Sequence, residues 1–174
     1  TMRRVATELD VQPSALYHHF PGKQALLAAV ADHILGRTPL VDEPGAADDD
    51  PSDWPVRLRL AAGRLRDSLL ACRDGAELVA TVQAYGLGTV RPDEVMTRIL
   101  TQAGIPDDLA HASARTMLFF VLGHVTDEQV NLQAGSAGAI DSDPHQGLAG
   151  RGSDFSTGVD LVIAGIQAHL PAAP

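Results

Sequence analysis

The sequence has 174 residues, of which 45% are hydrophobic, and its formal net charge at pH 7 is −9. This length and apolar content suffice for one globular core, or one core plus a small module, and they exclude a disordered chain. Because no apolar run is long enough to span a bilayer and Cys72 is the only cysteine, we expect no membrane partner, no intrachain disulfide and a reducing, cytoplasmic location.

The charge is distributed unevenly along the chain. Residues 1–37 hold four basic and three acidic side chains, so the negative excess belongs to the remainder. Contacts with phosphate are local, since charges are screened over about 8 Å at physiological salt. A near-neutral N-terminal segment on an acidic body therefore still permits binding to nucleic acid, with modest non-specific affinity.

Residues 1–20 predict two short helices joined by a tight turn. Thr1 is a suitable N-cap for the first helix. Asp10 falls at the turn, and Asp is one of the few non-glycine residues that tolerate the left-handed region. Pro13 suits the first turn of the second helix. The apolar positions expected to face a core are Met2, Val5, Ala6, Leu9, Leu16 and Phe20.

The second helix then presents Ser14, Tyr17 and His18 outward, as the recognition helix of a helix-turn-helix does. A third helix is predicted to begin at Lys23 and to end near Gly36, and its apolar stripe is Leu26, Leu27, Val30 and Ile34. The helix N-terminus and the Lys23 ammonium together suit a backbone phosphate. The alternative is that Lys23 is an ordinary solvated lysine.

The run Leu16-Tyr17-His18-His19-Phe20, followed by Lys23, resembles the recognition helix of the TetR (tetracycline repressor) family of bacterial transcription regulators. The family usually has Gly where Asp10 stands and a small polar N-cap where Gln12 stands. The resemblance implies a DNA-binding domain over residues 1–37 that lacks the family's first helix and is loosely held. The residues expected at double-stranded operator DNA are Thr1, Arg3, Gln12, Ser14, Ala15, Tyr17, His18, His19 and Lys23.

The rest of the chain predicts an all-α body, because apolar residues recur at helical spacing and no segment alternates like a strand. Two segments rich in Gly, Asp and Ser or Pro, 38–53 and 134–152, are predicted to be loops. In the first loop, Asp48-Asp49-Asp50 is interpreted as solvated charge and not as a metal site. Helices are expected at 54–74, 77–87, 93–103, 107–133 and 155–170.

Body residues extend the resemblance to the family's ligand-binding and dimerisation domain, which we therefore expect over residues 54–170. The matching positions are Trp54, Arg73-Asp74-Gly75-Ala76, Gly104, Leu122-Gly123-His124-Val125 and Asp127-Glu128-Gln129. The resemblance implies a homodimer joined through the long and final helices, and apolar stripes on two such helices suit a bundle interface. The expected interface residues are Phe119, Phe120, Gly123, Val159, Ile163 and Ile166.

The same resemblance implies a ligand site with an altered chemistry. Tetracycline repressors hold a drug–magnesium chelate with polar side chains, whereas most matching positions here are apolar and only Asp127 keeps its acidic character. Magnesium requires oxygen ligands, so we expect no metal, no cofactor and a mostly apolar small-molecule inducer. The expected pocket residues are Ala61, Leu65, Val79, Val82, Met96, His124 and Asp127.

His124 and Asp127 lie three residues apart and allow three interpretations: a shared metal, a polar contact for the ligand, or packing at the dimer seam. One His and one carboxylate are too few for a closed metal site. The sequence as a whole predicts a transcriptional repressor that the ligand releases from its operator. The alternative is a dimeric helical scaffold with a non-functional head. An enzyme is not expected, because no nucleophile, base, phosphate loop or metal motif is arranged for catalysis.

Overall fold

The computed structural model describes residues 1–41, 50–136 and 144–170, and every element of secondary structure in them is helical. This confirms the predicted all-α fold. None of the described helices combines the length and the apolar character that a membrane crossing requires. The elements are α1 (Met2–Glu8), α2 (Pro13–His19), α3 (Lys23–Leu35), a 3-10 turn (Pro51–Asp53), α4 (Trp54–Leu70), α5 (Gly75–Ala84), α6 (Pro92–Gln102), α7 (Asp107–Ser136) and α8 (Pro144–Ala168).

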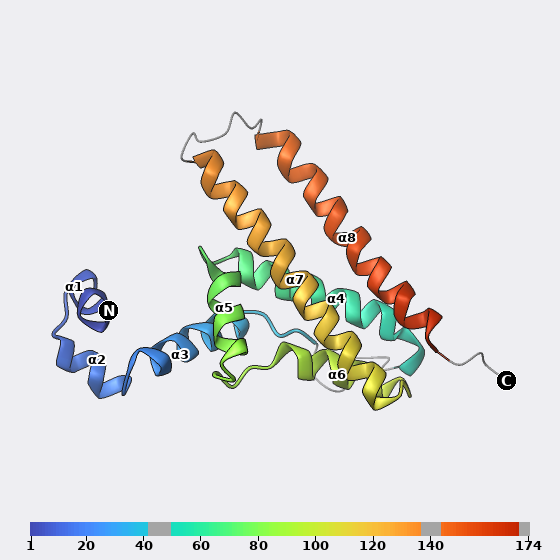
Figure 1. Ribbon diagram of the computed structural model, residues 1–174, viewed down its shortest axis with the longest axis horizontal. Coiled ribbons are helices and arrows are strands. Elements are labelled where there is room, and N and C mark those ends of the chain that lie inside the picture. The colour runs from blue at the N-terminus through green and yellow to red at the C-terminus, as the bar shows by residue number, and fades with distance from the viewer. Residues whose placement is uncertain (42–49, 137–143, 171–174) are drawn as a thin grey trace.

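Two units are visible in Figure 1: a small head, made by α1, α2 and the start of α3, and a larger body. The long helix α7 is the centre of the body, since it packs against α4, α5, α6 and α8. Helices α7 and α8 run side by side, and α3 leads from the head to the body, where it contacts α4 and α5.

The head has a small core of its own, separate from that of the body. Met2, Ala6 and Leu16 are buried there, and Val5, Phe20 and Leu26 pack against them. Thr1 caps α1 by accepting a hydrogen bond from the Arg4 N–H at 3.3 Å. Asp10 has φ of 52°, and Pro13 opens α2, as predicted.

Two apolar residues of the predicted stripes face solvent instead. Leu9 is 60% exposed because α1 ends at Glu8 and the chain turns away there. Val30 is 38% exposed, although Leu27 and Ile34 on the same helix pack in the body. Helical spacing identified the apolar positions, but it did not show how far the covering neighbours extend.

The predicted loops are shorter than the sequence suggested. Helix α7 continues to Ser136 and α8 begins at Pro144, so the loop expected over 134–152 is wrong at both ends. Of the loop expected at 38–53, residues 42–49 lie outside the described part of the chain, and Asp50 caps the 3-10 turn by accepting from the Ser52 N–H at 2.8 Å.

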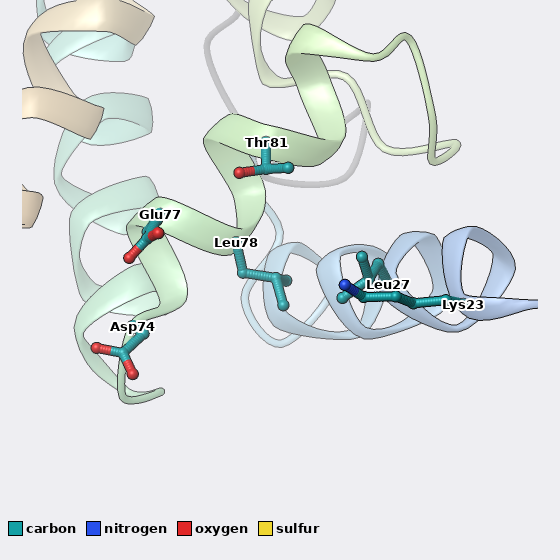
Figure 2. Close-up of a pocket in the computed structure, with 6 residues that line it drawn as sticks. All are labelled: Lys23, Leu27, Asp74, Glu77, Leu78 and Thr81. Carbon is teal, nitrogen blue, oxygen red and sulfur yellow. The ribbon is translucent and has the colours of Figure 1, made fainter. Parts of the chain in front are cut away.

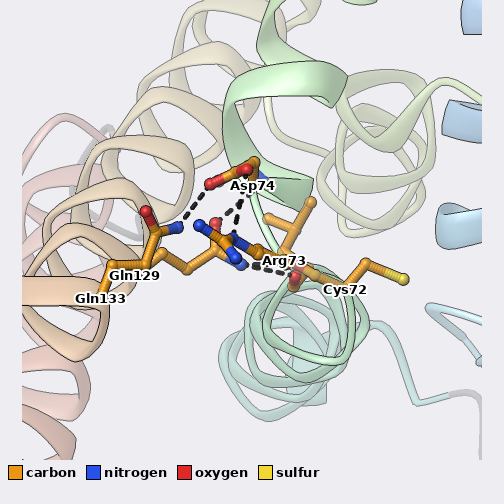
Figure 3. A network of polar contacts seen from close by, with 7 residues as sticks. Cys72, Arg73, Asp74, Gln129 and Gln133 are labelled. Atoms are coloured by element: carbon orange, nitrogen blue, oxygen red, sulfur yellow. Dashed lines mark hydrogen bonds and ion pairs between the residues drawn. The ribbon is translucent and has the colours of Figure 1, made fainter. Parts of the chain in front are cut away.

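The turn between α4 and α5 is held by α7 (Figure 3). The buried Gln129 side chain donates from Nε2 to the carbonyls of Leu69 (3.0 Å) and Cys72 (2.8 Å), and its Oε1 accepts from the Ala76 N–H at 3.3 Å. Asp74 adopts the left-handed conformation, with φ of 57°. Gln129 thus satisfies carbonyl groups at the end of α4 and an N–H group at the start of α5.

Gly75 stands at a position in this turn where the backbone leaves no room for a side chain. A Cβ at this position would lie 2.6 Å from the Leu69 carbonyl oxygen, which is closer than real Cβ contacts. We therefore predict that Gly75→Ala lowers the free energy of unfolding by about 1–3 kcal/mol, measured by urea denaturation at fixed protein concentration.

The matched control is Gly63→Ala within α4. A Cβ there would meet no described atom within 4 Å. This change should raise the free energy of unfolding by about 0.5–1 kcal/mol, because Ala is the better helix former. Equal effects of the two substitutions would show that the close approach at Gly75 is unimportant.

Candidate functional site

The outer face of the head carries the residues that the sequence singled out. Ser14, Ala15, His18 and His19 are exposed on α2, and Tyr17 is 52% exposed. The rings of His18 and His19 meet edge to face, with 5.4 Å between their centroids. The face therefore offers aromatic, imidazole and hydroxyl groups that can form hydrogen bonds or stack.

Residues next to this face keep polar groups toward solvent. Arg3 is exposed on α1, and Gln12 is exposed before α2, where its amide makes no capping hydrogen bond within the described residues. Thr1 differs, because its hydroxyl oxygen already caps α1. The capping hydrogen bond therefore fixes the position of the Thr1 side chain.

Lys23 is exposed at the first residue of α3 and lines a groove of about 310 Å³ between α3 and α5. Figure 2 shows Leu78 pointing from α5 toward α3 across this groove. The remaining lining residues are Leu27, Asp74, Glu77 and Thr81. Lys23 thus lies where the head meets the body.

Five of the predicted pocket residues come together in the body core. Ala61, Leu65, Val79, Val82 and Met96 are each at most 1% exposed and belong to one apolar cluster contributed by α4, α5 and α6. The packing of these three helices brings the five residues together. The environment they form is apolar, as expected from their types.

The two polar residues predicted for the pocket differ in exposure. Asp127 is exposed on α7, where its Oδ1 accepts from Asn131 Nδ2 at 3.3 Å. The His124 ring is half-buried between Phe120 and Phe155, at 5.7 Å and 5.3 Å between centroids. The described residues contain no group of three or more His, Cys, Asp or Glu side chains suited to a metal ion.

A buried ion pair beside His124 was missed by the sequence analysis. Arg66 Nη2 donates to both carboxylate oxygens of Glu128, at 2.8 and 2.9 Å, and Glu128 is only 3% exposed. The Arg66 guanidinium also lies 5.2 Å from the centre of the Phe155 ring. The available signal was the position of Glu128, seven residues after the buried Val121 and three after Val125 on the core face of α7.

Two nitrogen atoms at this ion pair remain without partners. His124 Nε2 and Arg66 Nε are buried and form no hydrogen bond with any described residue. Buried polar atoms are usually satisfied, since leaving one unpaired costs about 1–3 kcal/mol. The edge of the apolar core therefore holds unused hydrogen-bonding capacity next to Phe155.

The exposed face of the two long helices differs from the predicted interface. Val159, Ile163 and Ile166 are at most 4% exposed and pack in the core of their own subunit, so they are not available to a partner. Phe120 is half-buried and stacks on Phe155 with 5.7 Å between centroids. The exposed small or apolar residues described on these helices are Ala112, Thr116, Phe119, Gly123, Val130 and Leu132 on α7, and Leu161, Ala164, Gly165 and Ala168 on α8. Charged residues such as Arg115, Asp127 and Asp160 are exposed on the same helices.

These small and apolar residues lie beside charged ones, and the Arg115 guanidinium is 5.5 Å from the centre of the Phe119 ring. Phe119 is 59% exposed and Leu161 69% exposed, and the α7 members from Ala112 to Val130 recur at spacings of three, four and seven residues. The predicted interface residues on α8 are buried within their own subunit because α8 has two sides that carry apolar residues. One side covers α7 and α4 of the same chain, and the other faces outward.

A carboxylate on α3 connects the head-bearing helix to the segment between α5 and α6. Asp32 accepts hydrogen bonds from the Thr89 N–H at 2.9 Å, the Thr89 hydroxyl at 2.8 Å and the Val90 N–H at 3.0 Å. Burial raises the pKa of this carboxyl, but the hydrogen bonds from Val90 and Thr89 outweigh it and hold the pKa below the ordinary value. Asp32 is therefore charged at neutral pH.

Comparison with known proteins covers both units. A family model for "Tetracyclin repressor-like, C-terminal domain" matches residues 46–154, and one for "Bacterial regulatory proteins, tetR family" matches residues 1–30. The chain is 32% identical to the tetracycline repressor protein class A from transposon 1721 of Escherichia coli, over 95% of this chain and 80% of the relative.

Solved structures agree along nearly the whole length. The crystal structure of Mycobacterium smegmatis BioQ is 40% identical, with a TM-score of 0.78, over 98% of this chain and 87% of that one. A second structure, BioQ with its natural double-stranded DNA operator, is 39% identical, with a TM-score of 0.72, over 97% and 86% of the two chains.

Proposed function

The chain belongs to the TetR family of bacterial transcriptional regulators, and from this premise we propose that it is a homodimeric repressor, released from its operator by a mostly apolar small molecule. The family consists of DNA-binding regulators and not of enzymes. The observation that carries the proposal is the exposed face of α2 on a head with a separate core, joined by one helix to an apolar body.

DNA binding by the head is supported by its geometry. The exposed side chains of Tyr17, His18 and Ser14 project from α2, whose N-terminal half would enter the major groove. Lys23 at the start of α3 would contact a backbone phosphate, which positions the head but carries no sequence information. The similar BioQ structure holds its operator DNA. A scaffold with a non-functional head has no comparable support.

Homodimerisation is supported by the exposed apolar residues of α7 and α8. A two-fold symmetric interface places the same face of two copies against each other, so that Phe119 and Leu161 would be covered by a second chain. Small residues such as Gly123 and Gly165 would let the helices approach closely. Two copies would then form a four-helix interface from α7 and α8.

The core residues support the proposal of an apolar inducer. The class A relative is by name a tetracycline repressor, but Val79, Val82 and Met96 offer no oxygen atom to a magnesium chelate. A ligand among these residues would be mostly apolar. The unpaired nitrogens of His124 and Arg66 would hydrogen-bond to one acceptor group on it.

We predict that Tyr17→Ala and Lys23→Ala both weaken binding to the operator upstream of the protein's own gene while the dimer stays intact. Lys23→Ala should act about equally on all sequences and reduce the salt dependence by about one phosphate contact, and Tyr17→Ala should reduce discrimination between sequences. Mobility shift at several salt concentrations measures both effects.

The matched control for these variants is Tyr85→Ala, since Tyr85 is 69% exposed but lies at the end of α5, in the body. It should leave operator affinity unchanged. If neither head variant altered that affinity, the assignment of this face to DNA would be incorrect.

A second prediction separates the two faces of the terminal helices. Phe119→Asp should dissociate the dimer into folded monomers, because the charge would be buried only between subunits. Ile163→Asp should unfold the subunit itself, because Ile163 is 4% exposed within its own core. Sedimentation and circular dichroism distinguish the results, and a Phe119→Asp protein that remained dimeric at micromolar concentration would rule out this interface.

The third prediction concerns the ligand. Tetracycline with magnesium should neither stabilise the protein nor release it from DNA, whereas an apolar inducer at 100 times its dissociation constant should add about 2.7 kcal/mol of stability. Thermal shift and operator release, followed with a panel of hydrophobic antibiotics and metabolites, measure this. Asp127→Asn should have no effect on either readout, and magnesium-dependent stabilisation by micromolar tetracycline would contradict the prediction.

A further inference from the structure

The orientation of the head is determined where α3 enters the body. The cores of the two units are separate, and α3 carries the connection between them. Its C-terminal residues Ala31, Ile34 and Leu35 are buried in the body core, whereas Lys23 and Val30 are exposed. A small rotation or tilt of α3 at its point of entry therefore moves the whole head.

Asp32 lies at this point of entry, and its contacts are directional. Its carboxylate receives hydrogen bonds from the N–H and hydroxyl of Thr89 and from the N–H of Val90, all between 2.8 and 3.0 Å. Hydrogen bonds to a charged group are short and depend on angle. Apolar packing alone would allow α3 to slide or rotate, whereas these bonds fix its rotation against the loop.

The loop that receives Asp32 is shaped for close approach. Gly88 has φ of +82°, and a Cβ on it would lie 2.9 Å from Asp32 Oδ1 and 3.2 Å from Val82 Cγ1. Only glycine adopts this conformation readily and leaves room for both neighbours. The residue that contacts the loop from the other side, Val82, is 1% exposed in the body core.

The loop is also fixed to α5. The Gln83 side chain donates from Nε2 to the Val90 carbonyl at 2.9 Å, and the Leu87 N–H donates to the Val82 carbonyl at 3.0 Å. Residues 82–90 thus form a firm support tied to the body. A carboxylate bound to this support holds α3 in one position relative to the core.

We propose that Asp32 is a specificity-determining residue: by holding α3 against Thr89 and Val90, it fixes the separation of the two heads in the homodimer and hence the half-site spacing that the protein accepts. This inference rests on the proposed function. Two recognition helices must enter major grooves about 34 Å apart, or a multiple of this. The nine helical steps from Asp32 back to Lys23 span about 14 Å, so a tilt of about 10° displaces the head by about 2 Å.

The test compares Asp32→Asn with Asp160→Asn in the intact protein. Asn keeps the shape of Asp32 but loses the charge and one acceptor. Asp160 is an exposed carboxylate on α8 that pairs with Arg59 at 2.7 Å, away from the joint, so it is the matched control. The half-sites are first located by footprinting upstream of the gene. The specific probes are then duplexes in which two of these half-sites are separated by spacers of different lengths. Calf-thymus DNA is the non-specific probe.

Wild type and Asp160→Asn should show one preferred spacing. Asp32→Asn should bind that spacing at least about tenfold more weakly and should discriminate less than about threefold between neighbouring spacings, with unchanged affinity for calf-thymus DNA. A variant that only loosened the fold would lower its melting temperature and all DNA affinities together. Retention of a sharp spacing preference by folded Asp32→Asn would overturn the proposal.

A second variant keeps the test decisive if Asp32→Asn does not fold. Thr89→Val removes one hydroxyl donor at an exposed position and should broaden the spacing preference to a smaller extent. An unchanged preference in Thr89→Val would then overturn the proposal. Failure of the wild type to bind any duplex would instead count against the proposed function, so the two failures are distinguishable.

Discussion

The packing of α7 is the constraint on which the rest of the structure depends. One side of this helix buries Met117, Val121 and Val125 against the other helices of the body, and burying each such side chain contributes about 1.5–3 kcal/mol. The same side carries Gln129, whose amide holds the end of α4 to the start of α5. Because α7 fixes these elements, it also fixes where α5 can support α3.

Among the described residues, α3 carries the connection between the head and the body. A ligand among Val79, Val82 and Met96 would lie next to α5 and to the loop that binds Asp32. Under the proposed function, movement there would reach the exposed face of α2 by shifting α3. A coupling free energy of about 1–3 kcal/mol, typical of such links, corresponds to a change in affinity of about 5- to 150-fold.

The sequence was sufficient for the head and for the fold class because their signals are local. A cap at Thr1, a left-handed residue at Asp10 and Pro13 at a helix start each depend on neighbours within a few residues. The sites that depend on tertiary structure were harder to predict from the sequence. Apolar periodicity identified Val159 and Ile163 as buried, but it could not show that the cover comes from the same chain. The contacts of Asp32 with Thr89 and of Arg66 with Glu128 join residues about 60 positions apart, and no local pattern marks them.

Two of the polar contacts described above lie at joints between helices, at the α4–α5 turn and where α3 meets the body. The body core is formed by aliphatic side chains whose contacts define volume more strongly than direction. Hydrogen bonds depend on angle, and here they occur at the α4–α5 turn through Gln129 and at the α3 joint through Asp32. Replacing Gln129 by an aliphatic residue would leave backbone groups of the turn without their partner, and replacing Asp32 would remove the hydrogen bonds that hold α3 against the loop. In the repressor proposed above, the contacts of Asp32 would hold α3, and with it the head, in one position relative to the body.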